Sequence, residues 1–195
     1  MKEQFVLILF CTSLLTSCSQ TYKLSEEDFK WMPYNGDETL EFRSNDGDTN
    51  KIFILKKDTL LAYPEAQSLN GRVYEVVSVL CNHYSRDNLG KGRRYYFFEV
   101  QKAKGNRTEI VFELSANDVE FYRLSPVKID SLIKVKPMIL QTSYGLYDDV
   151  YVINPDDNGM YFYNRSGFIT KLFWSKSNGL VRYDMKDGVY WELLK

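Results

Sequence analysis

Residues 168–194 read FITKLFWSKSNGLVRYDMKDGVYWELL and indicate three β-strands joined by two tight turns. The runs 168–174, 180–183 and 189–193 are rich in aromatic and β-branched side chains, which suit strands. Asn178-Gly179 and Asp187-Gly188 separate these runs, and such dipeptides readily adopt the positive φ angles of a hairpin turn. The C-terminal part of the chain therefore predicts an antiparallel, three-stranded meander.

The strand pattern continues toward the N-terminus. Residues 73–81, VYEVVSVLC, are apolar on both faces, which is typical of a central strand covered on both sides. Residues 94–102 and 108–114 predict a hairpin around Lys104-Gly105-Asn106. Residues 127–135 fit a strand or a short helix, and their periodicity does not decide between the two.

A single short helix is expected near the N-terminus of the domain. Ser25 can cap it, the acidic run Glu26-Glu27-Asp28 suits its positive end, and Pro33 stops it. We therefore expect residues 25–195 to form one mainly β domain. It would hold about ten short strands in antiparallel sheets, arranged as a sandwich or a half-open barrel.

Residues 1–17 have the features of a secretory signal peptide. Lys2 supplies a positive charge, residues 5–15 form an apolar run, and Thr16-Ser17 are small enough for a peptidase pocket. The run is shorter than the roughly 20 residues that a membrane-spanning helix needs. Residues 1–17 are therefore predicted to leave the chain during secretion.

Leu15-Thr16-Ser17-Cys18 resembles the lipobox of bacterial lipoproteins, in which an aliphatic residue and two small residues precede an invariant cysteine. The resemblance implies that Cys18 becomes the first residue of the mature protein and carries diacylglyceryl and N-acyl chains. Several acyl chains give stable membrane anchoring, whereas one chain alone binds marginally. Residues 18–24 would then be a short tether. The alternative is an ordinary secretory signal that is cleaved elsewhere.

The residues after Cys18 bear on location. No Asp follows Cys18 directly, which among lipoproteins of enteric type resembles outer-membrane sorting rather than inner-membrane retention. The acidic cluster that resembles the surface-export signal of Bacteroidota lipoproteins is absent until residues 26–28. The resemblance thus implies a lipid-anchored protein of the cell outer membrane that faces the periplasm. Together with the lipobox, the closing block in residues 172–193 is similar to small uncharacterised lipoproteins of Bacteroidota, and it implies no activity.

Charge and cysteine content exclude some classes of function. The formal net charge is −1, and the signal peptide removes Lys2 and Glu3 together. A nucleic-acid partner would require a basic surface, so nucleic-acid binding is not expected. If Cys11 leaves with the signal and Cys18 carries lipid, Cys81 has no disulfide partner. Stability must then come from the core, for which 15 Tyr, 12 Phe and 3 Trp provide aromatic area.

Cys81 and His83 are the first candidates for chemistry. His83 is the only histidine, which limits acid–base catalysis near neutral pH and excludes a multi-histidine metal site. Two residues apart on a strand, the pair would share a face with Cβ atoms about 7 Å apart, too far for a routine hydrogen bond. We therefore expect a buried core thiol beside a strand-end histidine. A thiol–base pair or a corner of a metal site is the alternative.

Acidic residues supply two further candidates. Asp46-Gly47-Asp48-Thr49-Asn50 begins like a calcium loop, but Lys51 and Lys57 stand where Gly and Glu are required, so a polar hairpin turn is expected. Asp148-Asp149 and Asp156-Asp157 could bind a hard cation or act as paired carboxylates. Solvated turn residues are the favoured interpretation, and no metal ligand or catalytic acid is assigned.

Basic and aromatic runs have similar alternatives. Gly90-Lys91-Gly92-Arg93-Arg94 lacks the spacing of a phosphate-binding loop; it could contact anionic headgroups, but a solvated loop is expected. Tyr95-Tyr96-Phe97-Phe98 and Tyr161-Phe162-Tyr163 could be exposed platforms that stack on sugars or apolar ligands. Because strand neighbours point to opposite faces, at least half of these rings must serve the core, and a core role is favoured.

Three hypotheses for function follow. The first is a non-enzymatic, membrane-tethered β domain with no cofactor, which binds a protein, glycan or lipid or serves an envelope structure. The second is a carrier of the lipoprotein-localisation type, whose half-open barrel holds acyl chains in a cavity lined by residues such as Phe98, Phe112 and Leu172, with a helix as lid. The third is a hydrolase, which the absent nucleophile motif and the single histidine disfavour.

The lipid on Cys18 can be tested directly. Cells that express the full chain and are fed radioactive palmitate should label the protein, and the Cys18→Ala variant should lose that label because the lipobox no longer has a cysteine to be acylated. Equal labelling of the two proteins would refute the anchor.

Overall fold

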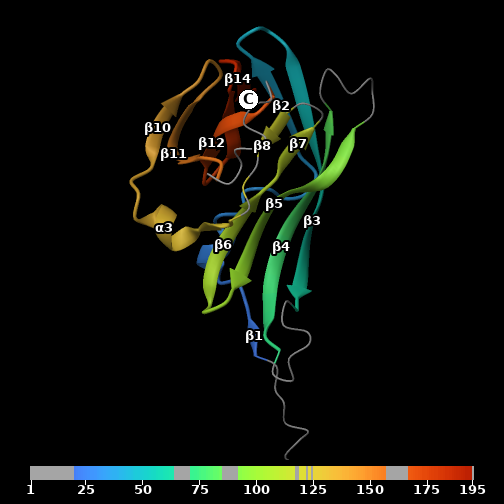
Figure 1. The fold of residues 1–195 in the computed structure, drawn as a ribbon, viewed down its shortest axis with the longest axis vertical. Helices are drawn as coiled ribbons and strands as arrows, with labels where there is room; N and C mark the ends of the chain where they lie inside the picture. The colour runs from blue at the N-terminus through green and yellow to red at the C-terminus, as the bar shows by residue number, and fades with distance from the viewer. Residues whose placement is uncertain are drawn as a thin grey trace, which may run out of the picture.

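Most of the residues that the structure describes form one curled sheet (Figure 1). The computed structural model describes residues 20–63, 71–84, 92–116, 119–121, 123, 125–156 and 167–194. Its helices are α2 (Glu26–Phe29) and α3 (Ile129–Ile133). Its strands are β1 (Thr21–Tyr22), β2 (Thr39–Ser44), β3 (Thr49–Ala62), β4 (Val73–Tyr84), β5 (Arg93–Ala103), β6 (Arg107–Phe112), β7 (Leu114–Ala116), β8 (Val119–Phe121), β9 (Val127–Lys128), β10 (Met138–Gln141), β11 (Leu146–Ile153), β12 (Ile169–Ser175), β13 (Gly179–Met185) and β14 (Tyr190–Leu193).

The strand order is β10-β11-β12-β13-β14-β2-β3-β4-β5-β6-β9. Neighbours in this order are antiparallel, while β1 adds to β4 in parallel, and β7 and β8 pair separately. The expected mainly β, antiparallel fold is confirmed, and of the two expected arrangements the sheet adopts the half-open barrel. The described strands exceed the expected ten because several are pieces of two or three residues.

The C-terminal meander is confirmed as β12, β13 and β14. Tyr183 pairs with Leu172 on one side and with Trp191 on the other. Gly179 and Gly188 adopt φ angles of +80° and +91°, as the two turns require. The turn at Gly179 also meets the N-terminal segment, because a Cβ atom there would lie 2.3 Å from the Tyr34 hydroxyl.

Two register shifts bend the long strands. One lies in β3 between Ile54 and Lys56, and the other falls where β4 pairs with β5, between Val79 and Leu80. An extra residue in one strand of a pair bends that strand and increases its twist. These positions are near the middle of β3 and β4, so the shifts help to curl the sheet between its upper and lower halves (Figure 1).

Aromatic rings fill the interior around Trp174. Its ring stacks on Phe98 with centroids 4.1 Å apart, and Phe112 and Tyr34 approach it edge-on at 5.0 and 5.8 Å. All four side chains are buried. Phe98 and Phe112 belong to β5 and β6, whereas Trp174 belongs to β12, so the stack joins opposite walls of the curled sheet.

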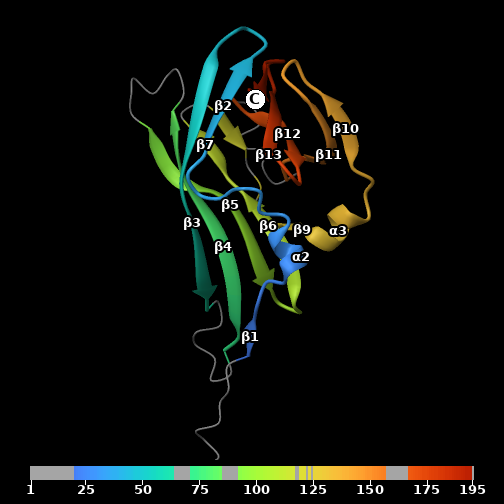
Figure 2. The ribbon, with the colours of Figure 1, turned by 180° about the vertical axis from the view of Figure 1, so that it is seen from behind.

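The N-terminal segment crosses the open side of this interior, as Figure 2 shows. It begins in β1, where Thr21 pairs with Val73 and the Tyr22 ring stacks on Tyr74 at 5.3 Å. From Gln20 onward, the residues assigned to a tether therefore lie against the domain. The remainder of the predicted tether, the signal peptide and Cys18 lie outside the described residues.

The expected N-terminal helix is confirmed as α2, but it is a single turn that ends at Phe29 and not at Pro33. The Ser25 side chain accepts a hydrogen bond from the Asp28 backbone, and the Asp28 carboxylate accepts one from the Ser25 backbone, which forms a capping box. At the other ambiguous segment, Val127–Lys128 is a strand and Ile129–Ile133 is helix α3. No helix among the described residues is long and apolar enough to cross a membrane.

A buried ion pair attaches α2 to the sheet. Lys102 Nζ lies 2.9 Å from Asp28 Oδ2 and donates to Thr108 Oγ1 at 2.9 Å. Burial alone would raise the pKa of Asp28, but hydrogen bonds from Ser25 and Lys102 hold that pKa below its ordinary value. Asp28 is therefore a carboxylate at neutral pH, and its charge is matched by Lys102.

Removal of one partner of this ion pair should destabilise the domain. Lys102→Met leaves the buried carboxylate of Asp28 without its cation and should lower the free energy of unfolding by about 3 kcal/mol. Urea denaturation followed by tryptophan fluorescence measures this loss. The matched control is Lys30→Met, which breaks the exposed pair with Glu27 on the same helix and should leave stability essentially unchanged. Equal losses in the two variants would contradict the assignment.

Candidate functional site

Cys81 and His83 lie side by side on the inner face of β4 and are completely buried. The expected shared face and core thiol are therefore observed. Burial raises the pKa of Cys81 to about 12, and a hydrogen bond with Tyr95 opposes only part of that rise. At neutral pH the residue is a protonated thiol inside the core, which is the opposite of an activated nucleophile.

His83 is the centre of a buried chain of hydrogen bonds. Its Nδ1 lies 2.9 Å from the Tyr95 hydroxyl, and its Nε2 lies 2.8 Å from Asn50 Oδ1. Asn50 Nδ2 in turn donates to the Tyr183 hydroxyl at 2.9 Å. Because the Asn50 amide nitrogen is used as a donor, its oxygen accepts from His83 Nε2–H, and Nδ1 accepts from Tyr95.

Burial keeps the imidazole neutral. It lowers the pKa of His83 to about 4, far below the ordinary value for histidine. Both ring nitrogens already bond to protein groups, and Asn50, Tyr95 and Tyr183 are buried as well. The arrangement fixes β3, β4, β5 and β13 relative to one another, but it exposes no base to a substrate.

The calcium-like sequence at residues 46–50 forms the hairpin turn between β2 and β3 and the first two residues of β3. Gly47 N–H donates to the Ser44 carbonyl at 3.0 Å, and Asp48 N–H donates to Ser44 Oγ at 3.0 Å. The expected polar turn is confirmed. Sequence reasoning missed that Asn50, its last residue, points inward to His83.

Two of the aspartates considered as a cation site or paired carboxylates, Asp149 and Asp156, bond to different neighbours. Asp149 accepts hydrogen bonds from the Ser175 hydroxyl and the Ser177 backbone. Burial would raise its pKa, but these bonds lower it. Asp156 Oδ1 lies 3.2 Å from Arg123, while Asp157 is outside the described residues. Within the described part of the chain, no group of three or more His, Cys, Asp or Glu could hold a metal ion.

The remaining predicted candidates divide between core and surface. Tyr95, Phe97 and Phe98 are buried, whereas Tyr96 is 43% exposed. This agrees with the expected core role for most of the first aromatic run, and residues 161–163 fall outside the described residues. Residues 90–91 of the basic loop are likewise outside, and Arg93 starts β5 with its guanidinium 6.0 Å from the Tyr95 ring centre.

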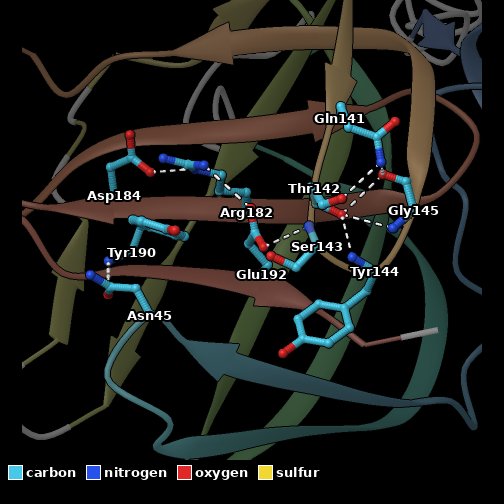
Figure 3. A network of polar contacts seen from close by, with 10 residues as sticks. All are labelled: Asn45, Gln141, Thr142, Ser143, Tyr144, Gly145, Arg182, Asp184, Tyr190 and Glu192. Atoms are coloured by element: carbon cyan, nitrogen blue, oxygen red, sulfur yellow. Dashed lines mark hydrogen bonds and ion pairs between the residues drawn. The ribbon is translucent and has the colours of Figure 1, made fainter.

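A polar network that was not among the candidates predicted from the sequence covers the outer face of the meander (Figure 3). Arg182 Nε donates to Asp184 Oδ1 at 2.7 Å and its Nη1 donates to Glu192 Oε1 at 3.3 Å. The guanidinium also lies 4.0 Å from the ring centre of Tyr190. Two carboxylates surround one cation, so the network offers no net positive charge to an anion.

This network holds the β10–β11 hairpin over the meander. Val150–Ile153 is the part of β11 that pairs with β12. The hairpin turn at residues 142–145 does not continue this pairing but lies over the meander strands (Figure 3). There Ser143 N–H donates to Glu192 Oε2 at 3.0 Å. The hairpin encloses a second apolar cluster, formed by Leu140, Tyr147, Val150, Phe173 and Val181.

A signal for this network does exist in the sequence. Arg182 and Asp184 are two apart on one strand and so share a face, and Glu192 stands directly opposite Arg182 once the meander is in register. The missing information was the position of Ser143, which is 49 residues from Glu192 in the sequence and depends on how the β10–β11 hairpin folds back.

Two shallow grooves lie on the sheet away from these groups. The larger is about 510 Å³ and is lined by Lys51, Phe53, Leu55, Asn82 and Tyr84. The smaller is about 350 Å³ and is lined by Ala62, Tyr74, Val76, Gln101, Lys102, Ala103 and Lys104. Neither groove contains His83, Cys81 or a carboxylate, so neither forms a catalytic cleft around them.

Comparisons of the chain with protein-family models, curated protein sequences and solved structures find no match.

The buried histidine predicts a pH dependence of stability. Since the folded-state pKa of His83 is about 4 and an unfolded histidine titrates near 6.5, the unfolded state binds more protons between these values. Stability is therefore complete above pH 6.5 and falls as pH drops toward 4. Between pH 7 and pH 5 the loss from this residue should be roughly 2 kcal/mol.

Urea midpoints at the two pH values measure this loss. His83→Gln cannot titrate, so it should be less stable than the wild type at pH 7 but should lose much less stability on acidification. A parallel loss in the two proteins would show that His83 does not titrate as described.

Proposed function

We propose that this chain is a lipid-anchored protein of the cell envelope that acts as a non-enzymatic binding or structural module. By its lipobox resemblance, Cys18 would carry the acyl chains and hold the domain at the outer membrane, facing the periplasm. A protein, glycan or lipid partner would meet the outer surface of the sheet. The observation that carries the proposal is the filled interior, where the chain's own rings occupy the space that a carrier would need.

The carrier alternative requires an open apolar cavity. Phe98, Phe112 and Leu172, which were expected to line it, are 0%, 6% and 1% exposed. Phe98 and Phe112 pack directly on Trp174, and Tyr34 from the N-terminal segment closes the same cluster. These contacts support a packed core and argue against an interior cavity for lipid.

The hydrolase alternative requires an accessible base or nucleophile. His83 is bonded through both ring nitrogens, and Cys81 is a buried thiol whose pKa is raised. Of the four candidate carboxylates, Asp149 is bonded by neighbouring serines and Asp156 is paired with Arg123. This arrangement supports a structural role for these groups.

Truncation of the central ring separates the first two hypotheses. In a packed core, Trp174→Ala should lower the free energy of unfolding by about 4 kcal/mol, because it leaves a cavity among Phe98, Phe112 and Tyr34. Tyr96→Ala, which removes a ring that is 43% exposed, is the matched control and should cost far less. Urea denaturation measures both values.

Mass spectrometry of the wild-type domain purified from cell envelopes completes the test. We expect no stoichiometric lipid after the covalently attached chains are accounted for. A small stability loss in Trp174→Ala, together with acyl lipid that co-purifies with the wild type and is lost in this variant, would establish the carrier and overturn the proposal.

A further inference from the structure

Exposed aliphatic side chains gather where α3 leads into β10 and β11. Ile133, Val135 and Ile139 are 64%, 58% and 68% exposed, and Met138 and Leu146 are also exposed. The same segment has an inner side, because Ile129 and Leu132 of α3 are buried and α3 packs against β6. The exposed side chains are therefore not part of the buried core. We call them the α3–β10 face.

Lysines alternate with these aliphatic residues. The run Ile133-Lys134-Val135-Lys136 places an exposed lysine after each exposed aliphatic side chain, and Lys128 lies exposed before α3. Asp130 is the only acidic residue between residues 127 and 139, and Asp148 is also exposed on β11, two residues from Leu146. With three lysines against these two aspartates, the face is apolar and carries a small net positive charge.

We propose that the α3–β10 face docks on the surface of an anionic phospholipid bilayer. Aliphatic side chains can enter the boundary between headgroups and acyl chains, while lysines extend along it and meet the phosphates. This inference rests on the proposed membrane anchor, which would bring the face to a bilayer. The lysines distinguish this partner from an uncharged apolar one, since each is attracted by an anionic surface.

A second protein strand fits this face less well. β10 is an edge strand of the sheet, and an open edge can accept another strand. However, Pro137 stands immediately before β10 and lacks a backbone N–H, and Lys134 and Lys136 precede it. Proline and lysine near an edge oppose strand addition, whereas lysine favours an anionic lipid surface.

The position of the face has a consequence for orientation. In Figure 1, β1 lies at the lower end of the molecule, and α3 and β10 lie on one flank, opposite to β3. A domain attached only through its N-terminus would be free to stand away from the bilayer. Contact through the α3–β10 face as well would lay the domain along the membrane.

Vesicle binding by the unacylated mature chain tests the proposal. The chain Ser19–Lys195 lacks Cys18, and it retains the buried core from Leu24 onward. Sedimentation with vesicles of phosphatidylcholine alone is compared with vesicles in which about a third of the lipid is phosphatidylglycerol. We expect binding to the anionic vesicles that weakens with salt, and much weaker binding to the neutral ones.

Two double variants separate charge from apolar contact. Lys134→Gln/Lys136→Gln should weaken binding about 25-fold, at about fivefold for each lysine near an anionic surface. Ile133→Ser/Ile139→Ser should weaken it by about tenfold. The control is Leu60→Ser/Leu61→Ser, which changes aliphatic residues that are 48% and 49% exposed on β3 at the opposite flank and should bind as the wild type does. Thermal unfolding checks that each variant is folded.

The outcomes distinguish this proposal from the anchor itself. Absence of binding to anionic vesicles, or equal binding by the wild type and both double variants, would overturn the α3–β10 face as a lipid surface. A concentration-dependent dimer that Ile133→Ser/Ile139→Ser abolishes, without vesicle binding, would assign the face to a second copy and also overturn the proposal. Because this chain carries no acyl group, none of these results depends on palmitate labelling at Cys18.

Discussion

The stack of Trp174 on Phe98 is the contact on which the half-barrel depends. A curled sheet that does not close cannot hold its shape by hydrogen bonds alone, because its first and last strands have no partner at their outer edges. Here the two rings reach across the interior from β12 and β5, which lie far apart in the strand order. Cys81 is reduced and buried, so ring packing stabilises this fold. In many small domains a disulfide provides that stabilisation.

The N-terminal segment completes this interior from the open side. Tyr34 contributes a ring to the Trp174 cluster, and its hydroxyl accepts the backbone N–H of Leu180 at 3.0 Å. Asp28 and Lys102 fasten the same segment lower down on the sheet. The first elements of the domain are thus tied to the last ones, so the fold depends on contacts between the two ends of the chain.

The parts of the fold with local signals could be predicted from the sequence. The glycines at 179 and 188 marked the meander, and Ser25 with Asp28 marked a capped helix. The curl could not be predicted, because it depends on bulges at Leu55 and in β5, where no local residue pattern stands out. The same limit applied to the candidate site. The shared face of Cys81 and His83 followed from strand geometry, but the bonds of His83 to Asn50 and Tyr95 required the register of three strands.

The parallel pairing of β1 with β4 determines how the domain responds to tension from its N-terminus. Thr21 lies beside Val73, the first residue of β4, so the chain enters the sheet past the end of that strand and runs along it. A pull on the N-terminus then acts along the strand axis and shears the β1–β4 hydrogen bonds together with the Tyr22–Tyr74 stack. Bonds strained in shear resist as a group, whereas bonds pulled at right angles to the strands open one after another. In a domain held by this end, β1 would therefore resist detachment from β4.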